Sequence, residues 1–196
     1  SEMCIRDRYY VMLMQRRRDT MRNVTLFIAM SLDGYIAKKD GSVDWLQGQE
    51  TEQDDMVSYQ EFIQDVDTVI MGWNTYHQII TELSPERWLY EHLESYIFTH
   101  RKLIGKKNIH FIQGDICESI LHMKRQEGKD IWICGGADII QPLIEQNIID
   151  TYHISVIPII LGSGIPLFQG RKTILKLKLA ASKSYNGITD LIYKRR

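Results

Sequence analysis

The sequence predicts an α/β fold, with a mixed and mostly parallel sheet, helices on both faces and an antiparallel hairpin at the C-terminus. Short apolar runs rich in β-branched residues alternate with segments of helical periodicity. Two of these runs end at glycine and lead directly into a predicted helix, at residues 67–76 and 130–140. The chain ends with two extended segments joined by Asn186 and Gly187, a pair that favours a tight hairpin turn.

The segment 67–76 organises the rest of the chain. Residues 68–71 form a predicted buried strand, and Gly72 permits a tight exit from it. Asn74 or Thr75 is expected to cap a helix over residues 75–83, because a side-chain oxygen there accepts free backbone N–H groups. A strand that leads into a helix N-terminus is suited to bind an anion.

The segment 130–140 repeats this arrangement. Residues 131–134 form the predicted strand, Gly135 and Gly136 the break, and residues 137–146 the helix. Two such helix N-termini are suited to hold the two phosphates of a dinucleotide. Each junction alone is a weak signal, because strand-glycine-helix turns occur in most α/β proteins for topological reasons.

The remaining predicted elements complete the sheet and its covering helices. Strands are expected at residues 23–31, 95–99, 108–113 and 149–157, hairpin strands at 173–185 and 187–194, and helices at 52–65 and 115–126. The helix at 52–65 should bury one face, formed by Met56, Tyr59, Phe62 and Ile63. Residues 159–168 contain Gly-Ser-Gly but no lysine and no following helix, which favours a turn between strands over a phosphate loop.

Composition restricts the class of function. The 196 residues suit one domain, and a net charge of −1 with scattered basic residues gives no support to a nucleic-acid or membrane-surface role. Three cysteines without Cys-x-x-Cys spacing favour a reducing, cytoplasmic compartment. The six histidines show no i, i+4 pair, so we predict no metal site. A small-molecule partner is the expectation.

Residues 1–20 do not match the pattern of the rest. Their only apolar run is six residues long, too short for a signal-peptide core or a membrane span. The opening residues resemble a translated sequencing-adapter remnant. We interpret 1–20 as a non-native or disordered tail and 21–196 as the folded domain.

Five motifs occur in a characteristic order after residue 23. They are Ala-Met-Ser-Leu-Asp-Gly-Tyr-Ile-Ala at 29–37, Val-Ile-Met-Gly-Trp-Asn-Thr-Tyr at 69–76, Ile-Phe-Thr-His-Arg at 97–101, Ile-Cys-Gly-Gly-Ala-Asp at 133–138 and Pro-Ile-Ile-Leu-Gly-Ser-Gly-Ile-Pro-Leu-Phe at 158–168. Through them the chain resembles the dihydrofolate reductase superfamily, and most closely the reductase domain of bacterial riboflavin biosynthesis. The resemblance implies a dihydrofolate reductase-like fold and an NADPH-dependent reductase.

The resemblance also implies where NADPH would bind. The nicotinamide is expected against Ala29 and Ile36, and the adenosine 2′-phosphate near Thr99, His100 and Arg101. The pyrophosphate is expected between two groups of residues, which are Gly72, Trp73, Asn74 and Thr75 on one side and Gly135, Gly136, Ala137, Asp138 and Ile139 on the other. In this family the bond between the two glycines is typically cis.

The chain departs from the family pattern at two points. Trp73 stands where many relatives carry arginine, so that phosphate contact would be lost or replaced by stacking. A pterin needs a buried carboxylate for paired hydrogen bonds, and folate reductases place it in the helix after the active-site tryptophan. In this chain Ser58 or Tyr59 falls near that position, and Asp55 lies about a turn earlier. Folate is therefore disfavoured. The sequence also lacks the zinc deaminase motif of the bifunctional riboflavin enzyme.

The candidate catalytic residues are Asp33, Asp55 and Tyr59, and the candidate substrate contacts are Asp33 and Trp45. Asp33 equally suits a turn, since it precedes glycine. The resemblance implies hydride transfer from NADPH to a nitrogen heterocycle, most like 5-amino-6-(5-phosphoribosylamino)uracil reduction, with dihydrofolate reduction as the alternative. A nucleotide-binding module without catalysis is a third reading, favoured by Trp73. Apolar side chains expected on the terminal hairpin favour a homodimer.

Overall fold

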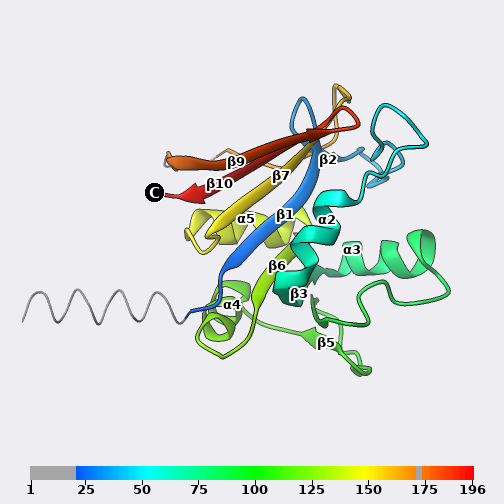
Figure 1. The fold of residues 1–196 in the computed structure, drawn as a ribbon. Coiled ribbons are helices and arrows are strands. Elements are labelled where there is room, and N and C mark those ends of the chain that lie inside the picture. Colours follow the sequence, from blue (N-terminus) through cyan, green and yellow to red (C-terminus); the bar gives the residue numbers. More distant parts are fainter. Residues whose placement is uncertain (1–20, 171–173) are drawn as a thin grey trace, which may run out of the picture.

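The computed structural model describes residues 21–170 and 174–196 and contains one large sheet (Figure 1). Its strand order is β5-β4-β3-β6-β1-β7-β10-β9. The strands are β1 (Val24–Ser31), β3 (Val66–Gly72), β4 (Glu94–Phe98), β5 (Ile109–Ile112), β6 (Asp130–Gly135), β7 (Thr151–Ile157), β9 (Leu177–Tyr185) and β10 (Ile188–Arg195). All pairings from β5 to β7 are parallel, whereas β10 pairs antiparallel with both β7 and β9. The predicted fold class is confirmed.

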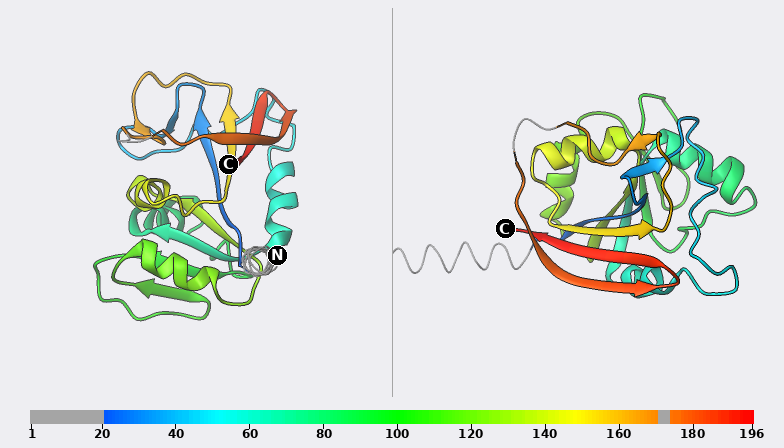
Figure 2. Two further views of the ribbon diagram at one scale, coloured as in Figure 1. Left: turned by 90° about the vertical axis from the view of Figure 1, so that its left-hand side faces the viewer. Right: turned by 90° about the horizontal axis from the view of Figure 1, so that it is seen from above.

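Helices cover both faces of this sheet. The helical elements are α2 (Val57–Phe62) with the 3-10 turn η1 (Ile63–Asp65), α3 (Trp73–Gln78) with the π-helical turn η2 (Ile79–Leu83), α4 (Ile116–Lys124) and α5 (Ala137–Glu145). Helices α4 and α5 lie on one face and α2 on the other (Figure 2). Parallel strands need such cover, because both of their faces are apolar.

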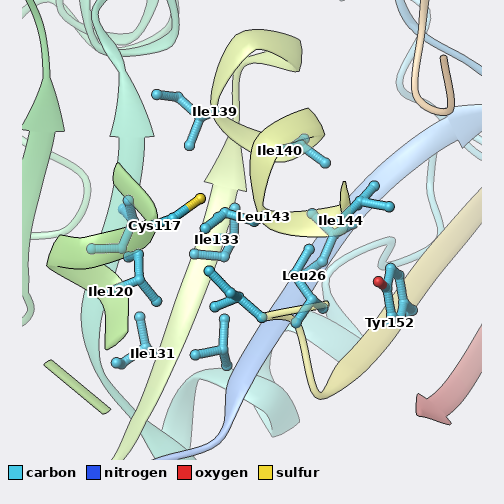
Figure 3. Close-up of a cluster of buried hydrophobic side chains, with 14 of the residues drawn as sticks. Leu26, Cys117, Ile120, Ile131, Ile133, Ile139, Ile140, Leu143, Ile144 and Tyr152 are labelled. Atoms are coloured by element: carbon cyan, nitrogen blue, oxygen red, sulfur yellow. The ribbon is translucent and has the colours of Figure 1, made fainter. Parts of the chain in front are cut away.

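Each face has its own apolar core. Under α4 and α5, Leu26, Ile133, Ile140 and Leu143 are fully buried (Figure 3). On the opposite face, the buried strand residues include Val69, Met71 and Trp132, and aromatic side chains of α2 pack against them. The central strand β1 therefore contributes to both cores and holds the two layers together.

Two predicted helix starts were wrong. Helix α2 begins at Val57 instead of residue 52, and Met56, expected to be buried, is 49% exposed. The Asp54 carboxylate accepts the Met56 N–H at 2.7 Å in a local turn, which replaces helical hydrogen bonding before this point. Helix α3 begins at Trp73 because the extended Gly72 is its N-cap, and no side chain caps it. Asn74 and Thr75 therefore lie inside the first turn.

Two further features differ from expectation. A small antiparallel sheet joins β2 (Tyr35–Ala37) to β8 (Ile165–Pro166), within the segment expected to be only a turn. It ties the chain after β1 to the chain after β7. No peptide bond of the described residues is cis, including the one between Gly135 and Gly136. The turn is made instead by Gly136 at a φ of 95°.

The proposed tail at 1–20 lies outside the described residues. Among the helices of the described chain, none has the length and apolar composition needed to cross a membrane.

Candidate functional site

The carboxyl half of β1 is open although the strand is central. Four successive residues, Phe27 to Met30, are partly exposed, while Val24 and Leu26 are fully buried. Phe27 and Ala29 belong to clusters on the α2 side, and Ile28 and Met30 pack against the core under α5. Ligands of parallel sheets bind at the carboxyl ends of strands. This half of β1 is therefore the floor of the candidate site.

The two glycine turns lie side by side next to this floor. Strands β3 and β6 pair directly, and a Cβ placed on Gly136 would lie 3.6 Å from Gly72 N and 3.6 Å from Thr75 Oγ1. The N-caps of α3 and α5 are Gly72 and Gly136, and neither helix has a side-chain cap. By contrast, the Asp115 carboxylate caps α4 by accepting the Glu118 N–H. Two neighbouring helix starts are thus left without a side-chain acceptor.

Uncapped N–H groups beside a backbone without side chains suit a phosphate. Asn74 and Asp138 are exposed, and Trp73, Thr75 and Ala137 are partly exposed, so all five are accessible at this edge. Ile139 is different, because its side chain is buried and packs under Gly72, where a Cβ would lie 3.0 Å from Ile139 Cγ1. Ile139 supports the turn and offers only its backbone to a ligand.

The residues after β4 form the next part of this edge. The buried Thr99 hydroxyl accepts the Arg101 N–H at 3.2 Å, which bends the chain back towards α3. The Arg101 guanidinium then lies over the Trp73 ring, 4.5 Å from its centroid. The His100 side chain is exposed, and its carbonyl accepts a hydrogen bond from Gln113. The structure therefore joins the Trp73 and Arg101 motifs, which lie far apart in the sequence.

Asp33 connects two loops on the other side of the floor. Its carboxylate accepts hydrogen bonds from the Ser31 hydroxyl at 2.6 Å, Leu161 N at 3.1 Å and Gly162 N at 2.7 Å. The hydrogen bond from Ser31, supported by those from the two backbone groups, holds the Asp33 pKa below its ordinary value. The side chain is exposed and ionised at neutral pH, so its geometry favours positioning of the loops over proton donation. Ile36 lies in β2, partly exposed, beside these loops.

The other candidate residues are distributed along the α2 side. Asp55 accepts hydrogen bonds from Gly48 N at 2.8 Å and Asn186 Nδ2 at 2.6 Å, which ties the loop before α2 to the hairpin turn. Tyr59 packs among Phe27 and Trp132, and burial raises its pKa. Trp45 is 7% exposed and packs with the apolar residues at the ends of β7 and β10. In this structure Asp55 holds two segments together by hydrogen bonds, while Tyr59 and Trp45 contribute to packing.

The sequence analysis missed a buried polar cluster beside this floor. Asp190 on β10 is completely buried, and its carboxylate accepts the Ser155 hydroxyl at 2.6 Å. His153 Nε2 lies 3.5 Å from Asp190 Oδ2. Burial would raise the Asp190 pKa, but interactions with His153, Ser155 and the Ser58 hydroxyl outweigh it, so the pKa is lowered. The signal was an acid at an inward position of the predicted strand 187–194, between Ile188 and Ile192.

Comparison with known proteins assigns this arrangement to a family. Residues 22–192 match the model of the RibD C-terminal domain. The chain belongs to the RibD C-terminal domain family. It is 38% identical over 177 residues to the uncharacterized protein YwjB of Bacillus subtilis, which covers 89% of this chain and 98% of that protein.

Solved structures agree with membership of the RibD C-terminal family. A putative riboflavin biosynthesis protein from Shewanella has a TM-score of 0.75 and 27% identity, covering 90% of this chain and 99% of that one. The deaminase and 5-amino-6-(5-phosphoribosylamino)uracil reductase of Thermotoga maritima has a TM-score of 0.66 and 14% identity, covering 91% of this chain and 58% of that one. Dihydrofolate reductase of Enterococcus faecalis, solved with NADP(H), has a TM-score of 0.62 and 12% identity, covering 89% and 96%. The last two show a shared fold.

Proposed function

We propose that this protein is an NADPH-dependent reductase that transfers a hydride to a nitrogen heterocycle, most like 5-amino-6-(5-phosphoribosylamino)uracil. The observation that carries the proposal is the half-exposed carboxyl end of the central strand β1, flanked by two glycine turns. Family membership and a fold shared with reductases support it.

The residues at the edge of the sheet suit a dinucleotide. The glycine turns at Gly72 and Gly136 leave room for the pyrophosphate, and the helix starts beside them carry no competing side-chain acceptor. Arg101 supplies a positive charge for the adenosine 2′-phosphate, and the Trp73 ring holds its guanidinium in place. We assign Ala29 and Ile36 to the nicotinamide, because both are partly exposed beside the open end of β1.

The bound cofactor would supply the hydride. The chain's own residues orient the two ligands and exclude water from the space between them. Asp33 fixes the loop after β1 to the loop at Leu161 and Gly162, which shapes the nicotinamide end of the site. Trp45 covers the neighbouring apolar surface. Precise positioning of this kind accounts for a large share of catalysis in such enzymes.

Dihydrofolate reduction is the second candidate. Helix α2 presents Ser58 and Tyr59 to the sheet and no acid, which disfavours it. However, the same face holds the buried carboxylate of Asp190, and this observation keeps the candidate open. The third reading, a nucleotide-binding module without catalysis, is favoured by Trp73. The Arg101 guanidinium over the Trp73 ring argues against it, because it offers a cation at the same edge of the sheet.

One experiment tests these readings. NADPH oxidation is followed with 5-amino-6-(5-phosphoribosylamino)uracil and, separately, with dihydrofolate, alongside direct titration of NADPH. We expect turnover with the uracil and little with dihydrofolate. Tight NADPH binding without turnover on either compound would favour the binding module, and no NADPH binding would overturn the proposal.

We also propose that the protein forms a homodimer and binds neither nucleic acid nor membranes. Strand β9 is an edge strand, almost all of its residues are exposed, and Leu179 is 51% exposed. Such an edge is a template for pairing with a second copy. Light scattering during size-exclusion chromatography would measure the mass, and a monomer at all concentrations would contradict this proposal.

A further inference from the structure

We propose that Asp190, held by Ser155 and His153, is the substrate-recognising carboxylate of this protein, and that it binds an amidine-like edge of a planar nitrogen heterocycle. This inference rests on the proposed function for the placement of the heterocycle. The carboxylate lies on strand β10, whereas the acid expected by resemblance to folate reductases would lie on a helix.

The first support is the register of three neighbouring strands. Ala29 pairs with Ser155 across β1 and β7, and Ser155 pairs with Asp190 across β7 and β10. Directly paired residues point to the same face of a sheet. Two strand spacings separate Ala29 from Asp190, or about 9.5 Å. A flat heterocycle that lies against the nicotinamide ring assigned to Ala29 would therefore reach the Asp190 carboxylate with its far edge.

The second support is a group of buried polar atoms that have no hydrogen-bond partner among the described residues. Trp45 Nε1 is in this state, and so are Asp190 Oδ2 and His153 Nε2, which face each other at 3.5 Å. Asp190 is 0% exposed and the other two residues are 7% exposed. A buried polar atom without a partner destabilises the structure, so a ligand that pairs with it gains affinity. They include a carboxylate acceptor and an indole donor, which a heterocycle can pair with.

The surroundings of Asp190 hold the carboxylate ready. The Ser155 hydroxyl donates to Oδ1 at 2.6 Å, and the Tyr185 hydroxyl lies 3.5 Å from the same atom. Oδ1 is thereby occupied, and Oδ2 faces His153 Nε2 at 3.5 Å. The ionised carboxylate needs a cationic or donor partner because it is buried. His153 at 3.5 Å is too distant for a good hydrogen bond, so a pair of N–H donors on a ligand would complete the pairing.

Asp190 is completely buried, so a ligand reaches it only when part of the chain moves, and the segment that carries Trp45 is the one we assign to this movement. Trp45 covers the row next to Asp190, formed by Ile157 and Ile188, and it contacts the same cluster as Ala29. The segment from Trp45 to Asp55 is not helical or extended, and its main tie is the Asn186 side chain, which bonds Glu50 and Asp55. We assign this segment as the cover that the heterocycle displaces.

The test uses two small probes of the same shape on the full chain. 2,4-Diaminopyrimidine offers adjacent N–H donors, and 2,4-dimethylpyrimidine offers none. We expect calorimetric binding of the diamino probe and at least tenfold weaker binding of the dimethyl probe. Asp190→Asn should weaken the diamino probe at least about tenfold and leave NADPH affinity unchanged. Trp45→Phe, which removes the indole N–H together with part of the ring, should weaken the same probe with no effect on NADPH.

A matched control is Asp150→Asn, which removes another ion-paired aspartate, bound to Lys124 at the opposite end of the sheet. It should leave both ligands unaffected. If Asp190→Asn fails to fold, Ser155→Ala serves in its place, since it removes the hydroxyl that orients the carboxylate. Equal binding of the two probes, or an unchanged affinity in these variants, would overturn the inference. If the protein binds NADPH but Asp190→Asn does not change probe binding, the inference fails and the proposed function stands. If probe binding depends on Asp190 but NADPH does not bind, the proposed function fails and the inference stands.

Discussion

The Arg101 guanidinium lies 4.5 Å from the centroid of the Trp73 ring, so that the first residue of α3 and a residue just after β4 form one unit. A cation stacked on an aromatic ring is attracted by its electron-rich face and loses much of its freedom to move. The tryptophan at the start of α3 thus holds in place an arginine from the end of another strand.

Arg101→Ala should weaken NADPH at least about tenfold and leave NADH almost unchanged, because the 2′-phosphate alone distinguishes the two cofactors. One charge-assisted hydrogen bond contributes roughly 1.5–3 kcal/mol, which corresponds to this factor. Fluorescence titration with each cofactor measures it. Lys107→Ala, which removes an exposed cation at the opposite end of β4, is the control. Equal weakening of NADPH and NADH would show that Arg101 does not contact the 2′-phosphate.

Gly136→Ala should abolish cofactor binding in a protein that still folds. At a φ of 95° and a ψ of 112° an L side chain is in a sparsely populated conformation that costs on the order of 1–3 kcal/mol, and the turn would shift to relieve it. The added Cβ would also stand 3.6 Å from Gly72 N, in the space assigned to the pyrophosphate. Gly114→Ala is matched to it, with a φ of 114° and no atom within 4 Å of its Cβ. Both variants should lose similar stability in urea, and only Gly136→Ala should lose NADPH.

Much of this arrangement could be predicted from the sequence, and the reasons are local. The glycine turns and Asp115 as the cap of α4 follow from propensities that act within a few residues. The partners of Trp73, Asp33 and Asp190 are set by strand order, which brings together residues as distant as Ser155 and Asp190. The sequence around Asp33 indicates a turn or a catalytic acid, whereas its hydrogen bonds to Leu161 and Gly162, which follow β7, depend on the tertiary structure.

Asp33→Asn should lower turnover about 10²-fold or more and leave NADPH affinity unchanged, because an amide oxygen can retain only part of the three hydrogen bonds. The Asp33 pKa is lowered, so the carboxylate is ionised throughout the neutral range. We therefore expect a pH–rate profile of unchanged shape at reduced height. Loss of one limb of that profile would instead make Asp33 the proton donor.

The buried Asp190 should make stability depend on acid pH. Its pKa in the folded protein is below the ordinary value of 3.8, so its stabilising contribution is complete above that pH. The contribution is lost as pH falls through the lower folded value. Urea unfolding from pH 6 to pH 2 should show a steeper decline for the natural protein than for Asp190→Asn. Parallel curves would mean that the carboxylate is not preferentially ionised in the folded state.

Asn186 should control the segment from Trp45 to Asp55. The residue occupies the hairpin turn at a φ of 45°, and its side chain donates to Glu50 O and Asp55 Oδ1 and accepts from Glu50 N. Asn186→Gly keeps the backbone geometry and removes all three hydrogen bonds, each of which contributes about 0.5–1.5 kcal/mol. Limited proteolysis should then cut this segment several times faster, since local opening governs cleavage. The matched control is Asn147→Gly, at a φ of 53° in the turn between α5 and β7. It should leave cleavage of the segment from Trp45 to Asp55 unchanged. If both variants are cut at the natural rate, the hairpin turn does not hold the cover.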